Sequence, residues 1–302
     1  MTIPCSNHGF FEGGISFDTI LPHLIVSGAR GGQLQLLKSY PEFWREEVAL
    51  ERMISLCRKR LHHSVAVPLR QVGDRRLSFE NDERNEFAQA VLDSVDNFES
   101  PRLYFIGHSR GGENALQMAT SPLNIKNVHG VIMLNSAGLR IHRGLEPFWK
   151  ISITLRLLDL RVLNFFLHPL LYIVYNYALG LRVPSGSAAE AALRSMRTFA
   201  LSRIMPCLDA INQNNQVRFL HAYSGSDFLI EAEVSKELAS KLERRIELEC
   251  AVPDSDEITR ATIRAFSRGY QTVSVNFVKE GHFLQKFRAK YLVDVILTLI
   301  RM

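Results

Sequence analysis

Residues 102–119 read RLYFIGHSRGGENALQMA, and the fold prediction starts from this stretch. An apolar run leads into a cluster of glycines around Ser109, and a helix-like stretch leaves it. Gly107, Ser109 and Gly111 match the pattern G-x-S-x-G, in which serine stands on a sharp strand-to-helix turn and the glycines prevent clashes. An ordinary glycine-rich turn after a buried strand has the same local sequence. The choice between a nucleophile and a turn residue therefore depends on the rest of the chain.

Strand-like and helix-like segments alternate around this stretch. The expected strands lie at 22–26, which leads into a small-residue loop at 27–32, and within 63–73, 102–107, 128–138, 217–227 and 272–282. The expected helices lie at 33–61, broken near Pro41, and at 78–98, 111–121, 231–248 and 289–300. This order predicts an α/β protein with a mostly parallel sheet and helices on both of its faces.

The alternation stops over residues 140–215, which are rich in helix-like, apolar sequence. We interpret this segment as a helical cap inserted into a single domain that spans residues 1–302. Inside it, residues 162–181 carry no charge and approach the length of a bilayer span. Asn164, His168 and Asn176 count against insertion, because membrane spans tolerate few polar groups. A buried or lid helix pair is favoured, and peripheral contact with a lipid surface stays open.

A serine hydroxyl is a poor nucleophile without a base that takes its proton. His282 is the best base by position, because it directly follows the last expected strand. His108 is adjacent to the serine and should point away from it, whereas His221 lies inside a strand and fits a packed residue. His129 and His142 flank the strand expected within 128–138. Neither has a partner acid at the place along the chain that a catalytic base requires.

The acid that orients the base should also follow a strand, and Asp227 does so. Asp254 and Asp256 are alternatives, but they lie in a polar segment with no strand directly before it. The order serine, aspartate, histidine, with each residue at the end of a strand, is the order of the α/β hydrolases.

An oxyanion hole needs two backbone N–H donors. One is expected from Arg110, the residue after the serine. The other is expected from the loop after the first long strand, where Ala29 is favoured and Arg30 is next.

The stretches FIGHSRGGENALQMAT (105–120), VIMLNSAGLRIHRGLEP (131–147) and AALRSMRTFAL (191–201) resemble the α/β-hydrolase superfamily. More specifically, they resemble an uncharacterised family of α/β hydrolases, found largely in nematodes. The resemblance extends from about Pro68 to the C-terminus. It implies an eight-stranded fold with a helical cap, and it implies Ser109, Asp227 and His282 as nucleophile, acid and base. One departure stands out: such proteins usually begin the oxyanion loop with His-Gly, and this chain has Ser27-Gly28.

The composition excludes several other classes. The net charge of +5 and the pI near 9.1 come from scattered basic residues, and no nucleic-acid-binding motif is present. The 4 cysteines lie far apart without a CxxC pair, which argues against a metal site and a disulfide framework. No dinucleotide or phosphate-binding fingerprint appears, so no cofactor is expected. The first residues do not form a secretory signal, and reduced cysteines favour a cytoplasmic protein.

Two functions follow from these observations. The favoured one is a serine hydrolase that acts on an ester, thioester or amide through an acyl-enzyme, with a small-molecule or lipid-like substrate. The apolar insertion favours a hydrophobic acyl chain. The alternative is a non-catalytic binding or scaffold protein on the same fold, because a fold does not determine a function.

Overall fold

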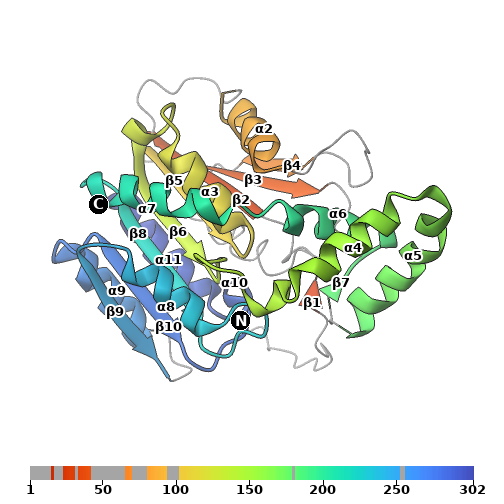
Figure 1. The fold of residues 1–302 in the computed structure, drawn as a ribbon. Coiled ribbons are helices and arrows are strands. Elements are labelled where there is room, and N and C mark those ends of the chain that lie inside the picture. The colour runs from red at the N-terminus through yellow and green to blue at the C-terminus, as the bar shows by residue number, and fades with distance from the viewer. Residues whose placement is uncertain are drawn as a thin grey trace, which may run out of the picture.

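The computed structural model describes residues 15–16, 23–30, 33–41, 65–69, 80–93, 102–178, 181–251 and 256–302 (Figure 1). Its main sheet has eight strands in the order β4-β3-β2-β5-β6-β8-β10-β9. These strands are β2 (His23–Arg30), β3 (Gln33–Pro41), β4 (Val65–Leu69), β5 (Arg102–His108), β6 (Val128–Leu134), β8 (Arg218–Ser224), β9 (Arg245–Cys250) and β10 (Thr272–Phe277). Strands β5, β6, β8, β10 and β9 are parallel, and β2 is antiparallel to both of its neighbours.

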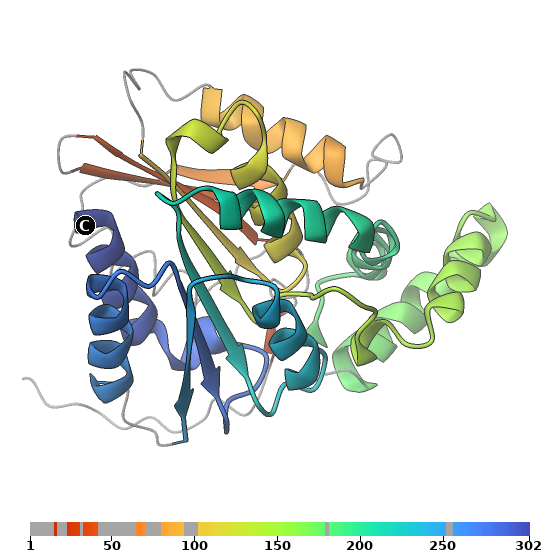
Figure 2. The ribbon, with the colours of Figure 1, turned by 60° about the vertical axis from the view of Figure 1, so that its left-hand side comes forward.

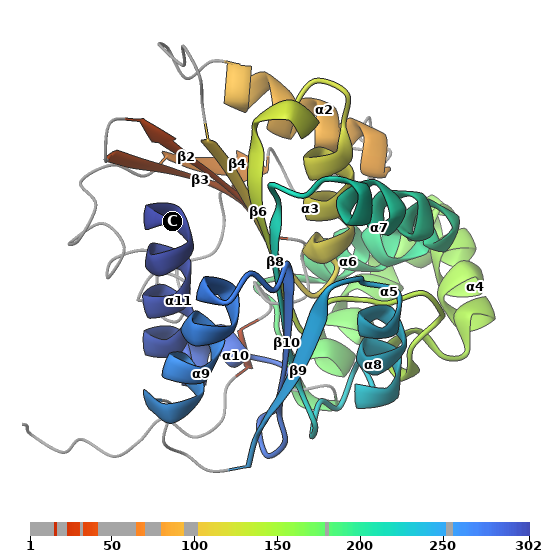
Figure 3. The same ribbon diagram turned by 90° about the vertical axis from the view of Figure 1, so that its left-hand side faces the viewer.

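Helices cover both faces of this sheet. The flanking helices are α2 (Asn81–Asp93), α3 (Gly111–Thr120), α7 (Ile204–Gln213), α8 (Ala232–Ser240), α9 (Asp256–Ser267), α10 (Leu284–Phe287) and α11 (Ala289–Arg301). Side chains alternate along β5, so that Tyr104 and Ile106 pack with residues of α9 and α11. Leu103 and Phe105 point to the other face and pack with residues of α2, α3, α7 and α8. Figure 3 shows these two helix layers on opposite sides of the sheet.

A separate apolar cluster lies in the segment between β6 and β8. Its residues come from α4 (Phe148–Leu158), α5 (Arg161–Ile173), the π-helical turn Val174–Ala178 and α6 (Gly186–Arg197). Helices α4 and α5 project away from the main sheet (Figure 2). A short parallel pair, β1 (Ile15–Ser16) with β7 (Leu181–Arg182), joins the N-terminal part of the chain to this region. No helix in the described residues is both long and apolar enough to cross a membrane.

The expected cap, 140–215, is therefore divided between two places. Helices α4 to α6 have their own core, whereas Leu208 and Ile211 of α7 belong to the core on the sheet. Helix α7 lies against α3, and the apolar faces of both helices pack on the same face of the sheet. Short 3-10 turns lie before α4 at Arg143–Leu145 and before α7 at Leu201–Arg203, and a third, Ile125–Asn127, lies between α3 and β6.

Two helix predictions are wrong in part. Residues 33–41 form strand β3, which pairs with β2 and β4; residues 42–61 lie outside the described part of the chain. The helix expected at 231–248 ends at Ser240, and the chain turns at Arg244, whose φ is 44°. Residues 245–250 then form edge strand β9 beside β10. The polar segment that follows contains helix α9, which the sequence analysis did not predict.

Candidate active site

Ser109 stands between the end of β5 and the start of α3, at the carboxyl edge of the parallel strands. Its φ is 52°, in the left-handed region that L-residues other than glycine rarely adopt. The turn is held by the Ser109 N–H, which donates to the Leu134 oxygen at 3.0 Å, and by the Ser109 oxygen, which accepts from the Gly112 N–H at 3.1 Å. Strain of this kind costs about 1–2 kcal/mol and is characteristic of functional sites.

Two glycines allow this turn. A Cβ on Gly107 would lie 2.4 Å from the Gly111 oxygen and 2.6 Å from the Gly112 Cα. A Cβ on Gly112 would lie 2.2 Å from Oγ of Ser136, the residue that follows Asn135 at the end of β6. The close approach of α3 to the sheet thus depends on Gly112, a position outside the G-x-S-x-G pattern that the sequence analysis singled out.

His282 and Asp227 are in direct contact. The loop after β8 supplies Asp227, the loop after β10 supplies His282, and Nδ1 of His282 lies 2.7 Å from Oδ2 of Asp227. The other carboxylate oxygen, Oδ1, accepts from the N–H groups of Leu229 at 2.8 Å and Ile230 at 3.1 Å. The carboxylate is therefore held on both sides, and it places the imidazole proton on Nδ1.

The other ring nitrogen of His282, Nε2, is not used in these contacts. Nε2 of His282 is buried and has no hydrogen-bond partner among the described residues. With the proton on Nδ1, this nitrogen carries a lone pair that accepts a proton. The ring of His108, the neighbour of Ser109 in the chain, lies 4.9 Å from the ring of His282. The base therefore lies beside the serine-bearing turn.

The backbone of His282 is anchored by side chains from two other strand ends. His108 Nε2–H donates to the His282 oxygen at 3.0 Å, so His108 turns toward the base loop and acts as a support. Asn135 follows β6, and its Nδ2 donates to the His282 oxygen at 2.7 Å, the Gly281 oxygen at 3.0 Å and Ser224 Oγ at 2.9 Å. Asn135 is 1% exposed and has a φ of 41°. Asn135 was not among the expected site residues, although it directly follows a buried strand, which is the same signal that marked Asp227.

The segment that follows β6 also supports the loop that carries Asp227. His142 Nδ1–H donates to the Leu229 oxygen at 2.9 Å, and the Gly144 N–H donates to the same oxygen at 2.9 Å. Burial lowers the pKa of His142 below its ordinary value, which favours the neutral ring that these contacts need. His142 is thus a support for the Asp227 loop.

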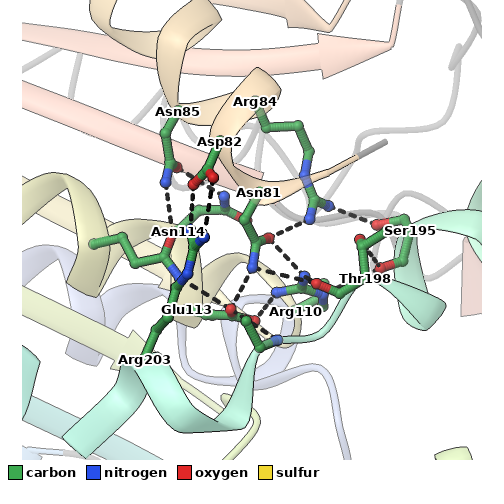
Figure 4. Close-up of polar contacts among 12 residues, drawn as sticks. Asn81, Asp82, Arg84, Asn85, Arg110, Glu113, Asn114, Ser195, Thr198 and Arg203 are labelled. Carbon is green, nitrogen blue, oxygen red and sulfur yellow. Dashed lines mark hydrogen bonds and ion pairs between the residues drawn. The ribbon is translucent and has the colours of Figure 1, made fainter. Parts of the chain in front are cut away.

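The side chain of Arg110 is buried in a polar cluster behind the turn (Figure 4). It forms an ion pair with Glu113, its Nη2 donates to Asn81 Oδ1 at 2.6 Å and to the Thr198 oxygen at 3.0 Å, and it lies 4.8 Å from the Phe199 ring. This side chain ties α3 to α2 and to the end of α6. The backbone N–H of Arg110 precedes the first turn of α3, where N–H groups have no partner within the helix. Arg110 therefore fits the expected donor to an oxyanion.

The cluster is strongly shielded from water. Glu113 is 0% exposed and Arg110 is 5% exposed. Burial lowers the pKa of Arg110 to about 10, and burial raises the pKa of Glu113 above its ordinary value. Arg84 joins from α2, where its Nη1 donates to Ser195 Oγ at 2.6 Å. Arg84 also donates to Asn81, whose side-chain amide donates to Glu113, so Asn81 links this second guanidinium to the ion pair.

The structure does not bring Ala29 to the serine. Strand β2 runs antiparallel to β5, so that Ala29 pairs with Arg102 and His23 pairs with His108. The length of β5, about 20 Å at 3.3 Å per residue, separates Ala29 from the serine end of the strand. Arg30 is one position farther along β2, beyond Ala29. The structure therefore contradicts Ala29 as the second oxyanion donor: residues 27–30, expected in a loop, lie in β2, which runs antiparallel to β5.

The remaining alternatives lie elsewhere. Asp256 begins α9 and pairs with Lys290 at 2.6 Å, whereas Asp254 is outside the described residues. His221 is fully buried in β8 and contacts Ser274, as expected for a packed residue. In the part of the chain that the structure describes, no group of His, Cys, Asp and Glu side chains is arranged to hold a metal ion.

Comparisons with known proteins agree with this architecture. Residues 71–301 match the family described as "Alpha/beta hydrolase of unknown function (DUF1057)". The chain is 32% identical over 225 residues to the uncharacterized protein F35H12.5 of Caenorhabditis elegans, an alignment that covers 72% of this chain and 63% of that protein.

Solved structures share the fold at low sequence identity. The enol-lactonase of Burkholderia xenovorans superposes with a TM-score of 0.57 at 13% identity, over 93% of this chain and 96% of that one. The bromoperoxidase of Bacillus anthracis superposes with a TM-score of 0.53 at 9% identity, over 92% and 95%. These likenesses show the α/β-hydrolase fold. The chain belongs to the family of α/β hydrolases of unknown function whose pattern it matches over residues 71–301.

Proposed function

We propose that the protein is a serine hydrolase that cleaves an ester, thioester or amide through an acyl-enzyme. Oγ of Ser109 attacks the carbonyl carbon while Nε2 of His282 takes the hydroxyl proton. The proton then passes to the leaving group, which departs as the acyl-enzyme forms. Nε2 next takes a proton from water, and the resulting hydroxide attacks the acyl carbon. The bond between this carbon and Ser109 Oγ then breaks, Oγ takes the proton from Nε2, and the acid is released. Asp227 keeps the other imidazole proton on Nδ1 throughout.

One observation carries the proposal. His282 is oriented by Asp227 at 2.7 Å and keeps a buried Nε2 without a partner among the described residues, and its ring lies 4.9 Å from that of His108, the residue before Ser109. An unpaired buried nitrogen is costly in a purely structural role. A base that must accept a proton from the serine accounts for it. The Arg110 N–H supplies one donor to the oxyanion, and the apolar helices of the cap favour a hydrophobic acyl chain.

A fluorophosphonate probe tests the reaction on the full chain, with mass spectrometry to locate the adduct. The wild-type protein is expected to carry the adduct on Ser109, and Ser109→Ala is expected to carry none. Asp227→Asn leaves the imidazole without its orienting anion and is expected to slow labelling by about 10²-fold to 10⁴-fold. Ser240→Ala, which removes an exposed hydroxyl on α8, serves as the control and labels at the wild-type rate. A folded wild-type protein without an adduct on Ser109 excludes the proposal.

The second candidate is a non-catalytic binding protein on the same fold. The position of Ala29 favours it, because the predicted pair of oxyanion donors is not assembled in the described residues. This function predicts an unlabelled wild-type protein whose melting temperature rises with acyl compounds. A hydrolase instead turns over p-nitrophenyl esters, and a series of acyl-chain lengths then reveals its preference.

A further inference from the structure

The outer helices of the cap expose a stripe of large apolar side chains. On α5, Val162 is 74% exposed, Phe165 is 77% exposed and Phe166 is 66% exposed. The stripe continues at Ile173, 52% exposed, and positions spaced by three, four and eleven residues share one side of a helix. Trp149 on α4 is 60% exposed. A contiguous apolar patch of this kind marks a binding surface, whereas isolated apolar side chains do not.

Three polar side chains of α5 and of the π-helical turn after it bond to other parts of the cap. Asn164 is 7% exposed and its Nδ2 donates to the Leu158 oxygen at 3.1 Å. Nε2 of His168 lies 2.7 Å from Oε2 of Glu190 on α6. The side-chain amide of Asn176 donates to the Val183 oxygen and accepts from the Val183 N–H, both at 3.1 Å. A helix on the surface of a water-exposed domain has the opposite arrangement. The aromatic face of α5 is therefore the side that the cap turns outward.

The charged side chains of residues 148–178 are mostly basic. The sequence of residues 148–178 has Lys150, Arg156 and Arg161 as its basic residues and Asp159 as its acidic residue. Asp159 is paired with Arg194 at 2.6 Å, so its charge is already compensated. Lys150 and Arg156 are exposed on α4, the helix that also carries Trp149. Basic residues beside exposed aromatic residues are the pattern of helices that bind anionic lipid headgroups.

We propose that the α4–α5 face docks on the surface of a lipid bilayer that contains anionic lipids. Helix α5 has 13 residues and is thus about 20 Å long, against about 30 Å for the hydrocarbon core, so it lies along the interface. Phe165 and Phe166 enter the acyl-chain boundary, and Lys150 and Arg156 contact phosphate and carboxylate groups. A second copy of the chain fits less well, because a two-fold contact presents the same patch to itself and brings these cations together.

Flotation of the full-length protein with vesicles tests this docking. Phosphatidylcholine vesicles with about 30% phosphatidylserine are compared with phosphatidylcholine alone, at low and high salt. The protein is expected to float with the anionic vesicles, to bind the neutral vesicles more weakly and to lose the difference at high salt. Emission of Trp149 is expected to shift to shorter wavelength on binding, and Trp149→Phe removes the shift.

Two pairs of substitutions separate the apolar and the charged contributions. Phe165→Ser with Phe166→Ser is expected to lower vesicle partitioning by at least about tenfold, because two apolar side chains are no longer transferred from water. Lys150→Glu with Arg156→Glu is expected to remove the preference for anionic vesicles. Leu123→Ser is the matched control, because Leu123 is 71% exposed outside the cap, and it is expected to float like the wild type.

The proposed binding of the α4–α5 face to a bilayer does not depend on the reactivity of Ser109. Ser109→Ala is therefore expected to float with the vesicles like the wild type, which separates failure of the docking from failure of the hydrolase. Absence of flotation in the folded wild-type protein overturns the proposal. So does flotation that survives the double serine substitution. A dimer in sedimentation velocity that this substitution makes monomeric, without vesicle binding, assigns the face to a second copy instead.

Discussion

Asn135 donates from Nδ2 to the main-chain oxygen of His282 at 2.7 Å, and it joins the end of β6 to the loop that carries the base. The same amide group contacts the Ser224 hydroxyl at 2.9 Å at the end of β8. Asn135 touches neither the imidazole ring nor the serine hydroxyl in any contact described above. Its role is therefore to position the backbone from which the imidazole projects.

Asn135→Ala is expected to lower the rate of fluorophosphonate labelling by about 10-fold to 100-fold, because displacement of a catalytic group by even about 1 Å has effects of this size. The free energy of unfolding is expected to fall by about 1–3 kcal/mol, since buried carbonyl oxygens lose their donor. Urea unfolding and labelling kinetics measure the two effects. Asn124→Ala is the control: Asn124 is 2% exposed and donates to the Met118 oxygen at 2.9 Å, away from the base loop. It should lose similar stability and label normally. Equal labelling rates for the two variants contradict the positioning role.

Gly112→Ala is expected to destabilise the protein by about 1–3 kcal/mol or more, as overpacking of a close contact does. The new Cβ meets Ser136, 2.2 Å from its Oγ and 2.4 Å from its Cβ. Ser136→Gly in the same chain removes both atoms and is expected to restore much of the melting temperature. Gly281→Ala is the control, because a Cβ there has no neighbour within 4 Å. If the double variant is no more stable than Gly112→Ala alone, the clash with Ser136 is not the cause.

Glu113→Gln is expected to cost about 3–5 kcal/mol of unfolding free energy, because it removes the buried carboxylate that pairs with Arg110. Replacement of both partners, Glu113→Leu with Arg110→Met, is expected to recover part of this loss, since Arg110 is then no longer a buried charge without its partner, whereas the buried Arg84 stays in place. Asp82→Asn breaks the ion pair with Arg203, whose side chains are 58% and 49% exposed. That exposed pair is expected to contribute less than about 1 kcal/mol. Urea unfolding distinguishes the outcomes, and equal losses from the two single variants contradict the prediction.

The stability of the protein is expected to depend on His221 in acid. Burial lowers the pKa of His221 to about 4 from an ordinary value of 6.5. The unfolded chain therefore binds a proton that the folded chain rejects, so stability present above pH 6.5 is lost as the pH falls toward 4. This single group accounts for about 3 kcal/mol over that interval. His221→Phe keeps the ring beside Tyr223 and is expected to lose correspondingly less stability over the same range. Parallel curves of unfolding free energy against pH for the two proteins contradict this assignment.

Local patterns predicted part of the fold well. The segments 102–120 and 289–300 form β5, α3 and α11, because an apolar run before a glycine turn and a strongly amphipathic helix are short-range signals. The segments 33–41 and 245–248 were interpreted as helix but lie in β3 and β9. In β9, Ile246, Leu248 and Cys250 alternate with exposed residues, which is the period of a strand. The strand period decides the structure of β9 because β10 supplies its hydrogen bonds, and helix α9 separates β9 from β10 in the chain. Strand β3 pairs with β2, which directly precedes it, and with the more distant β4.

The sequence by itself determined which residue types follow the strands: a serine between glycines after β5, an aspartate after β8 and a histidine after β10. Parallel strands end at a common edge, so their order along the chain was enough to expect these three side chains near one another. Only the tertiary structure decided the direction of β2, the support of His282 by Asn135 and the burial of Arg110 with Glu113. These three features depend on strand direction and on contacts between segments that are distant in the chain. Hydrogen bonds and ion pairs act over a few ångströms in space, so only the folded chain shows which distant residues meet.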